Sequence, residues 1–176
     1  MNVEDAMVSE VLACLPGQAL IEVARCMSDR GVGCAPVLAN DGTRRVVGML
    51  TDRDICRAAA TQAEPLDRLR VEGCMSRTVR SCRFGDSVHA AAAIMRAYGL
   101  RRLPVVDEEG HLRGLIALSD IARDAVQGEI SGEGHLPPSE IVETLAAMGR
   151  ADPERGAADR KPEGRAASPQ ARRARE

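Results

Sequence analysis

The stretch that decides the fold is RGVGCAPVLANDGTRRVVGMLTDRDI, residues 30–55, because the chain contains it twice. Residues 98–121, YGLRRLPVVDEEGHLRGLIALSDI, repeat three of its four glycines, its proline and its Asp-Ile ending in the same order. The match extends back to residues 6 and 74 at a constant offset of 68, and after a two-residue deletion it continues at an offset of 66. A repeat this long is one structural unit copied twice, and each copy covers part of the other's apolar face.

Each copy contains the same series of predicted elements. A short strand comes first, and an amphipathic helix follows in which apolar residues recur at i, i+3, i+4 and i+7. Two strands joined by a Gly-containing turn come next, and a second helix closes the copy. The predicted ranges are 11–12, 20–27, 35–38, 46–51 and 53–60 in copy one, and 78–79, 88–95, 103–106, 112–117 and 119–126 in copy two.

Glycine and proline sharpen these boundaries. Gly31 and Gly99 suit the left-handed position that ends a helix. Pro36 and Pro104 fall inside strands, so each strand should be an edge there or have that N–H side unpaired. A further helix is predicted at residues 140–148, with a stripe formed by Ile141, Leu145 and Met148.

The pattern β-α-β-β-α, present twice, predicts an α+β fold with helices packed on small sheets. We divide the chain into repeat one (residues 1–62), repeat two (63–130), a helical extension (131–148) and a tail (149–176). The tail contains no Val, Ile, Leu, Met or aromatic residue, and it carries eight Lys/Arg and five Asp/Glu. Such a segment cannot offset its ordering entropy by burial, so we expect it to be disordered.

Composition excludes several classes of protein. The net charge of −2 gives no electrostatic footprint for nucleic acid or for an anionic membrane, and a single Phe and a single Tyr provide no platform for base stacking. Six cysteines lack C-x-x-C spacing, so we read them as reduced structural thiols and expect no metal site. No signal-peptide core or long apolar run appears, which favours a cytoplasmic protein without membrane attachment.

The ordered motif series resembles the tandem cystathionine-β-synthase domain, or CBS pair. MVSEV and MSRTV open the copies, the two stretches quoted above follow, and VVGMLTDRDI and LRGLIALSDI end them. The resemblance covers residues 6–126. It implies two repeats related by a pseudo-twofold axis, clefts between them that take adenine nucleotides, and a disc-like homodimer.

The family's ribose-binding pattern resembles G-h-x-[ST]-x-x-D, and copy one has it intact from Gly48 to Asp54. A carboxylate at Asp54 can accept two hydrogen bonds from a ribose diol, and Thr51 offers a hydroxyl near a helix N-terminus that favours phosphate. The alternative is structural: Thr51 caps the helix and Asp54 is the acid of its first turn.

Copy two departs from this pattern. Ala117 replaces the hydroxyl residue while Asp120 remains, and Arg101 and Arg102 precede the Leu-Pro-Val strand. By resemblance, a basic residue at this place contacts phosphate; the alternative is a solvated arginine pair. The resemblance also suggests an adenine bed in one cleft from Val11, Leu12, Ala35 and Pro36. If the pseudo-twofold axis joins the ribose half of copy one to the phosphate half of copy two, the chain has one good site.

We therefore expect a regulatory module, not an enzyme, because no nucleophile–base arrangement or metal-ligand spacing appears. It would bind an adenosine-containing ligand such as AMP, ADP or ATP, require no cofactor, and relay binding to an unknown protein partner. The alternative is a ligand-free dimeric interaction scaffold.

Overall fold

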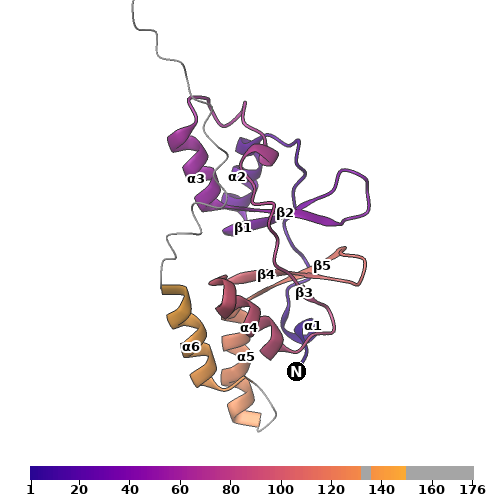
Figure 1. Ribbon diagram of the computed structural model, residues 1–176, viewed down its shortest axis with the longest axis vertical. Coiled ribbons are helices and arrows are strands. Elements are labelled where there is room, and N and C mark those ends of the chain that lie inside the picture. Colours follow the sequence, from indigo (N-terminus) through magenta and orange to yellow (C-terminus); the bar gives the residue numbers. More distant parts are fainter. Residues whose placement is uncertain (132–135, 150–176) are drawn as a thin grey trace, which may run out of the picture.

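Two similar halves lie one above the other in the computed structural model, which describes residues 1–131 and 136–149 (Figure 1). The first half contains α2 (Leu20–Asp29), β1 (Cys34–Leu38), β2 (Val46–Thr51) and α3 (Asp52–Thr61). The second contains β3 (Cys82–Arg83), α4 (Val88–Tyr98), β4 (Arg102–Val106), β5 (Leu112–Ala117) and α5 (Leu118–Ser131). Three elements lie outside the repeated series: α1 (Val3–Ala6), a 3-10 turn (Val71–Gly73) and α6 (Pro138–Gly149).

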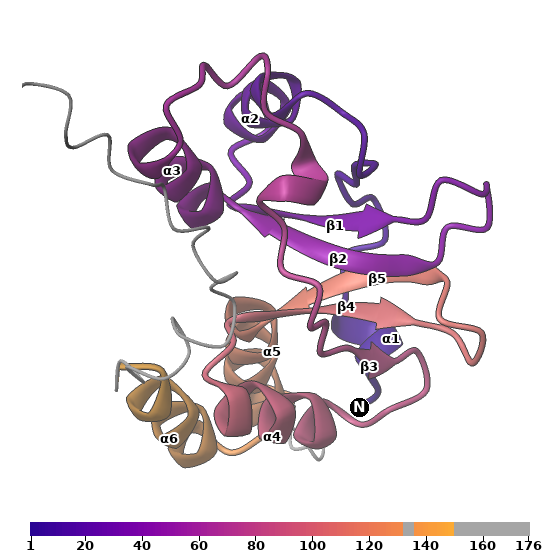
Figure 2. The same cartoon turned by 45° about the horizontal axis from the view of Figure 1, so that its top comes forward.

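The sheets lie between two layers of helices, with α2 and α3 on one outer side and α4, α5 and α6 on the other (Figure 2). One sheet has the order β1-β2 and the other β3-β4-β5. The antiparallel registers are equivalent, since Pro36 faces Met49 in one sheet and Pro104 faces Leu115 in the other. The predicted α+β fold of two repeats is therefore confirmed.

The predicted first strands are wrong in position. Residues 78–79 lie in no regular element, and β3 starts at Cys82, where β4 offers Val105 as a parallel neighbour. In copy one the strand shrinks to a single bridge between Cys14 and Val37. Residues 11–12 and 78–79 have no neighbouring strand to pair with, and β-propensity alone does not make a strand.

Backbone pairing crosses between the copies. The backbone N–H of Ser76 donates to the Met49 carbonyl, and the Met49 N–H donates to the Ser76 carbonyl, at 2.9 Å each. Val8 and Leu115 exchange the same two bonds, also at 2.9 Å. Residues 8 and 76 are repeat equivalents, as are 49 and 115, so the pseudo-twofold axis relates these contacts. The opening segment of each copy therefore belongs structurally to the other copy's sheet.

This exchange also explains the two prolines. Both backbone groups of Leu115, its N–H and its carbonyl, hydrogen-bond to Val8. Leu115 therefore makes no backbone hydrogen bond to Pro104, which lies opposite it. On the other side, β3 reaches only Val105 and Val106. Pro104 thus sits within the middle strand of its sheet with no ladder bond lost, as the prediction of an unpaired N–H side requires.

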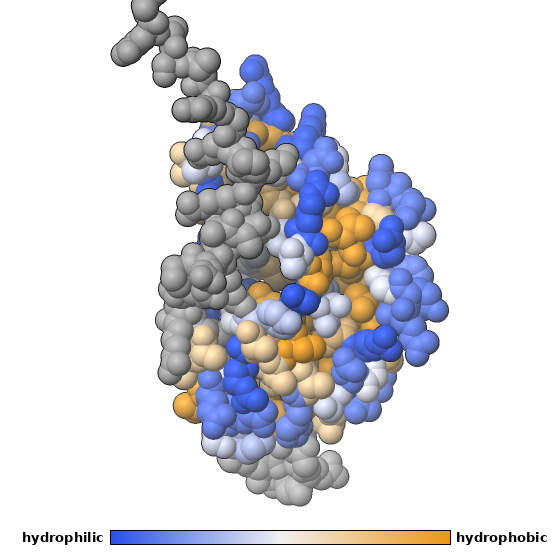
Figure 3. Space-filling view, viewed as in Figure 1, coloured by the Kyte–Doolittle hydropathy of each residue, from blue (hydrophilic) through white to orange (hydrophobic). Residues whose placement is uncertain are grey.

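Each half has its own aliphatic core, and α1 joins the core of the second half through Val3. Gly31 and Gly99 adopt φ of +62° and +56°, as expected for residues that end α2 and α4. Figure 3 shows hydrophilic residues along the rim of one face, with apolar side chains exposed between them. No helix among the residues that the structure describes is long and apolar enough to cross a membrane.

The stripe predicted for the C-terminal helix is partly wrong. Ile141 is buried against α4 and α5, but Leu145 is 52% exposed and Thr144 is buried in its place. Burial of Thr144 is tolerated because its hydroxyl donates to the Glu140 carbonyl at 2.7 Å. The predicted stripe member Met148 has no described side chain, and the tail predicted to be disordered lies outside the described residues apart from Gly149.

The six cysteines differ in burial, and Cys74 is intermediate between the buried and the exposed ones. Cys14 and Cys82, which are repeat equivalents, are buried, and burial raises the pKa of each thiol to about 12. Cys34 is also buried, whereas Cys26 and Cys56 are exposed. Burial agrees with the structural reading for Cys14, Cys34 and Cys82, whereas the exposure of Cys26 and Cys56 does not.

Candidate functional site

A cleft of about 460 Å³ opens between the two halves. Copy one contributes the start of α3 and the start of β1, and copy two contributes the segment before β3 and the start of β4. The lining residues are Gly33, Cys34, Met49, Thr51, Asp52, Arg53, Asp54, Ser76, Thr78, Arg80, Gly99, Leu100, Arg101, Arg102 and Pro104. Four predicted site residues, Thr51, Asp54, Arg101 and Arg102, thus line one cleft.

Thr51 and Asp54 form a capping box at the start of α3. The Asp54 carboxylate accepts the Thr51 backbone N–H at 3.0 Å and the Thr51 hydroxyl at 2.5 Å, through the same Oδ2 atom. Its Oδ1 atom lies 3.5 Å from an Arg57 guanidinium nitrogen. Thr51 and Asp54 therefore do cap α3, as the structural alternative states. The Asp54 carboxylate can still accept further hydrogen bonds at the wall of the cleft.

Copy two builds the same helix start without the hydroxyl. Asp120 accepts the Ala117 N–H at 3.0 Å and lies 3.4 Å from Arg123, which matches the Thr51, Asp54 and Arg57 arrangement. Asp120 does not line the cleft described above. The two carboxylates are thus structurally equivalent and differ in what surrounds them.

The basic side of the cleft crosses from one copy to the other. Gly33 has Asp52 and Arg102 beside it: a Cβ there would lie 3.2 Å from Asp52 Oδ2 and 3.6 Å from an Arg102 guanidinium nitrogen. Arg102 therefore reaches from β4 to the start of β1. Burial raises the pKa of the Cys34 thiol, and the nearby Arg102 charge opposes that shift while Asp52 adds to it.

Two lining residues escaped the sequence reasoning. Thr78 and Arg80 lie in the irregular segment between Ser76 and β3, and Arg80 stacks on the Tyr98 ring, 4.2 Å from its centroid. The repeat alignment could have found Arg80, which is the equivalent of Leu12 at the offset of 68, whereas Thr78 aligns with Glu10, which was not a candidate residue.

The proposed adenine bed lies elsewhere. Val11 and Leu12 line a separate depression of about 360 Å³, together with Arg30 and Arg44. Ala35 is fully buried in the core of the first half, and Pro36 is buried opposite Met49. The structure does not bring these four residues to the cleft of Thr51, where the copy-two equivalent of Pro36, Pro104, is found instead.

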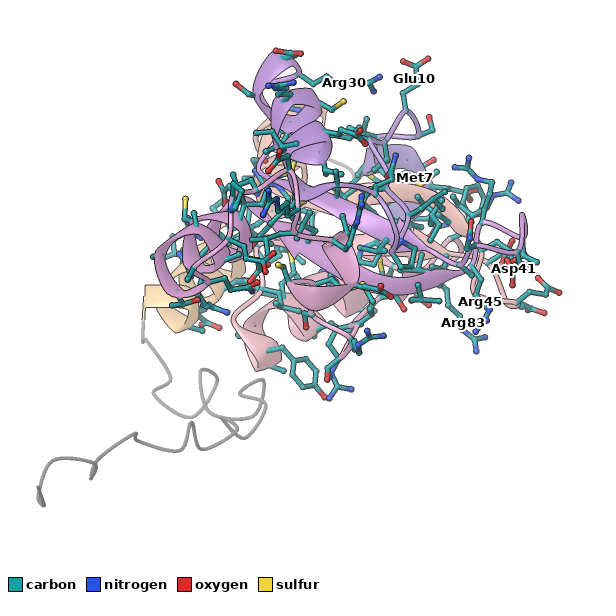
Figure 4. All side chains as sticks on the ribbon, turned by 90° about the horizontal axis from the view of Figure 1, so that it is seen from above. Met7, Glu10, Arg30, Asp41, Arg45 and Arg83 are labelled. Carbon is teal, nitrogen blue, oxygen red and sulfur yellow. The ribbon has the colours of Figure 1, made fainter. Side chains whose placement is uncertain are left out.

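One group of possible metal ligands occurs in the described part of the chain. Asp107, Glu109 and His111 lie at the turn between β4 and β5, with ligand atoms within 4.8 Å of one another. His111 is 3.3 Å from Asp107, and the His111 backbone N–H donates to the same carboxylate at 2.8 Å. These contacts stabilise the turn between β4 and β5, which explains why the three side chains lie close together. Asp41 and Arg45 form the corresponding pair on the β1–β2 loop (Figure 4).

The CBS domain family model matches residues 3–61 and 71–126, and the chain belongs to this family. Among curated proteins, the CBS domain-containing protein YhcV of Bacillus subtilis is 35% identical over 132 residues, which covers 74% of this chain and 90% of that protein. The two matched segments correspond to the two sequence repeats.

Solved structures with the same fold include proteins that hold adenosine ligands. The CBS domain pair of protein MJ0100, in complex with 5'-methylthioadenosine and S-adenosyl-L-methionine, has a TM-score of 0.63 at 23% identity. CBSX2 in complex with AMP has a TM-score of 0.61 at 23% identity. Each match covers 73% of this chain and 98% of that chain, so both share the whole two-repeat architecture.

Proposed function

We propose that this protein is a regulatory module that binds a phosphorylated adenosine, such as AMP, ADP or ATP, in the cleft between its repeats. The observation that carries the proposal is the composition of that cleft. It joins the Thr51–Asp54 cap of copy one to Arg102 of copy two, whose guanidinium lies beside Gly33 and Asp52 of copy one. A ribose diol matches the carboxylate, and a phosphate matches the guanidinium groups.

Charge favours a phosphorylated ligand over other adenosine compounds. Four guanidinium groups line the cleft, from Arg53, Arg80, Arg101 and Arg102, against the two carboxylates of Asp52 and Asp54. The excess positive charge attracts a phosphate dianion and repels a sulfonium such as that of S-adenosylmethionine. AMP bound to CBSX2 supports a phosphorylated ligand in this fold.

Relay of binding to a partner completes the proposal. The cleft spans both copies, so a ligand that contacts both halves favours one arrangement of the halves over others. We propose that the protein acts as a homodimer in the cytoplasm and signals through its helical face or its tail to a protein partner. The ligand-free scaffold remains the second candidate, and the exposed apolar side chains of Val142 and Leu145 on α6 favour it.

The two helix pairs differ in how much of their surface another helix covers, and this difference gives a physical reason to expect a dimer. In the second half, α6 packs on α4 and α5. In the first half, Ala24, Met27, Val32 and Ile55 line a groove of about 380 Å³ between α2 and α3. Sedimentation at tens of micromolar should show a dimer; a monomer would contradict this part of the proposal.

Replacement of Arg102 by alanine tests the phosphate half of the site. We expect Arg102→Ala to weaken AMP and ATP about three- to tenfold, as for a charge-assisted bond at a solvent-exposed site, and to leave adenosine unchanged. Isothermal titration calorimetry with the three ligands measures this.

The matched control is Arg83→Ala, because Arg83 is exposed on β3 and lies at the outer edge of the molecule, outside the cleft (Figure 4). Equal losses of AMP and adenosine affinity in Arg102→Ala would mean that Arg102 contributes to folding and not to phosphate binding. If the unmodified protein gave no heat with any adenosine ligand up to millimolar concentration, the scaffold reading would stand.

A further inference from the structure

Arg80 and Tyr98 form a pair at the rim of the cleft. Tyr98 is the last residue of α4, and Gly99 ends that helix in the left-handed conformation, so the ring lies next to the loop that leads into Arg101 and Arg102. Arg80 comes from the irregular segment before β3 and lines the cleft. Its guanidinium carbon lies 4.2 Å from the centroid of the Tyr98 ring.

We propose that Tyr98 is a positioning residue for phosphate recognition, which holds the guanidinium group of Arg80 at the cleft. This inference rests on the proposed function and adds a specificity determinant to it. Tyr98 itself does not contact the ligand; it acts through Arg80.

The geometry allows Arg80 to serve both partners at once. A guanidinium group stacks through its face and donates hydrogen bonds through N–H groups in its plane. A ring on one face therefore leaves the in-plane donors free for phosphate oxygens. The stack is a cation–π contact, worth about 0.5–1 kcal/mol at an exposed position, and Tyr98 is 38% exposed.

The pair also limits the entropy lost on binding. A free arginine side chain loses rotamer freedom when it is fixed. Arg80 starts from a segment with no regular hydrogen-bonding pattern, so its side chain has no support from a strand or helix of its own. A guanidinium already held by Tyr98 has less freedom left to lose.

The first copy has no such pair. At the repeat offset of 68, Arg80 corresponds to Leu12 and Tyr98 corresponds to Arg30, and both of these residues line the separate depression near Val11. The stack is thus specific to the cleft that holds Thr51 and Asp54. It adds a third asymmetry between the copies, beside Ala117 and the Arg101–Arg102 pair.

Titration calorimetry with AMP and adenosine tests the inference on the full chain. We expect Tyr98→Leu to weaken AMP about two- to fivefold, the fold-change that corresponds to an exposed cation–π contact, with adenosine unchanged. Tyr98→Phe should bind AMP like the unmodified protein, because it keeps the ring. Arg80→Ala and the double variant Arg80→Ala/Tyr98→Leu should show the same loss as each other, since Tyr98 acts only through Arg80.

Three results would overturn the inference: unchanged AMP affinity in Tyr98→Leu, an equal loss for adenosine, or losses that add in the double variant. These outcomes differ from failure of the proposed function, in which the unmodified protein binds neither ligand. Tyr98 is the only tyrosine and the chain has no tryptophan, so tyrosine fluorescence offers a second readout of the same stack during the titration.

Discussion

Asp54→Ala is expected to lower the affinity for AMP by about ten- to a hundredfold, whereas Asp120→Ala leaves it nearly unchanged. The estimate corresponds to the loss of charge-assisted hydrogen bonds from a ribose diol, about 1.5–3 kcal/mol. Asp120 occupies the equivalent position in copy two, but Ala117 stands there in place of Thr51 and the residue does not line the cleft. Titration calorimetry on the two variants measures the difference.

The pair is a close structural control. Each variant removes one bond to a helix-capping N–H, from Thr51 or from Ala117, and one arginine contact, to Arg57 or to Arg123, and Asp54→Ala also removes the bond from the Thr51 hydroxyl. Any general cost of a weakened helix start therefore appears in both, and thermal unfolding records it. Equal losses of AMP affinity would mean two equivalent sites and would refute the composite site.

Gly114→Ala is expected to lower the free energy of unfolding by about 2–3 kcal/mol. A Cβ at this position would lie 2.7 Å from Met7 Sδ and 2.8 Å from the Val8 carbonyl oxygen. The sulfur can move, but the carbonyl belongs to the backbone bonds between Val8 and Leu115 that join the copies. Overpacking of a contact that cannot relax costs about this much. Denaturation in urea measures the change.

Gly73→Ala is the control, because Gly73 has no heavy atom within 4 Å of a Cβ and no positive φ. It should be neutral or slightly stabilising, since alanine restricts the unfolded chain. A further variant, Met7→Ala in the Gly114→Ala background, should recover only part of the loss, because the carbonyl contact stays. If Gly114→Ala unfolded like Gly73→Ala, the exchanged backbone pairing would not be a determinant of stability.

The repeated motif series predicts the helices and hairpins within each copy, but not the position of each first strand. Periodicity placed α2 and α4, the proline and glycine spacing placed the hairpins, and the Thr51-x-x-Asp54 pattern placed the start of α3. These features depend on local chain geometry, which sequence patterns report directly.

The features that the sequence did not reveal depend on contacts between the copies. An alignment of two repeats shows which residues correspond, but not that Ser76 pairs with Met49 of the other copy, nor that Val3 enters the core of the second half. For the same reason Val11 and Leu12 are expected at a cleft in which only the copy-two equivalent of Leu12, Arg80, is found. The Arg80–Tyr98 stack joins residues from different elements, and no spacing rule signals it.

The number of AMP molecules bound per chain at saturation tests the central claim most directly. Copy one supplies the complete ribose pattern and copy two supplies the arginines, so calorimetry of the unmodified protein should give one AMP per chain. A stoichiometry of two would contradict the composite site, because a second AMP would then bind outside the cleft that holds Asp54.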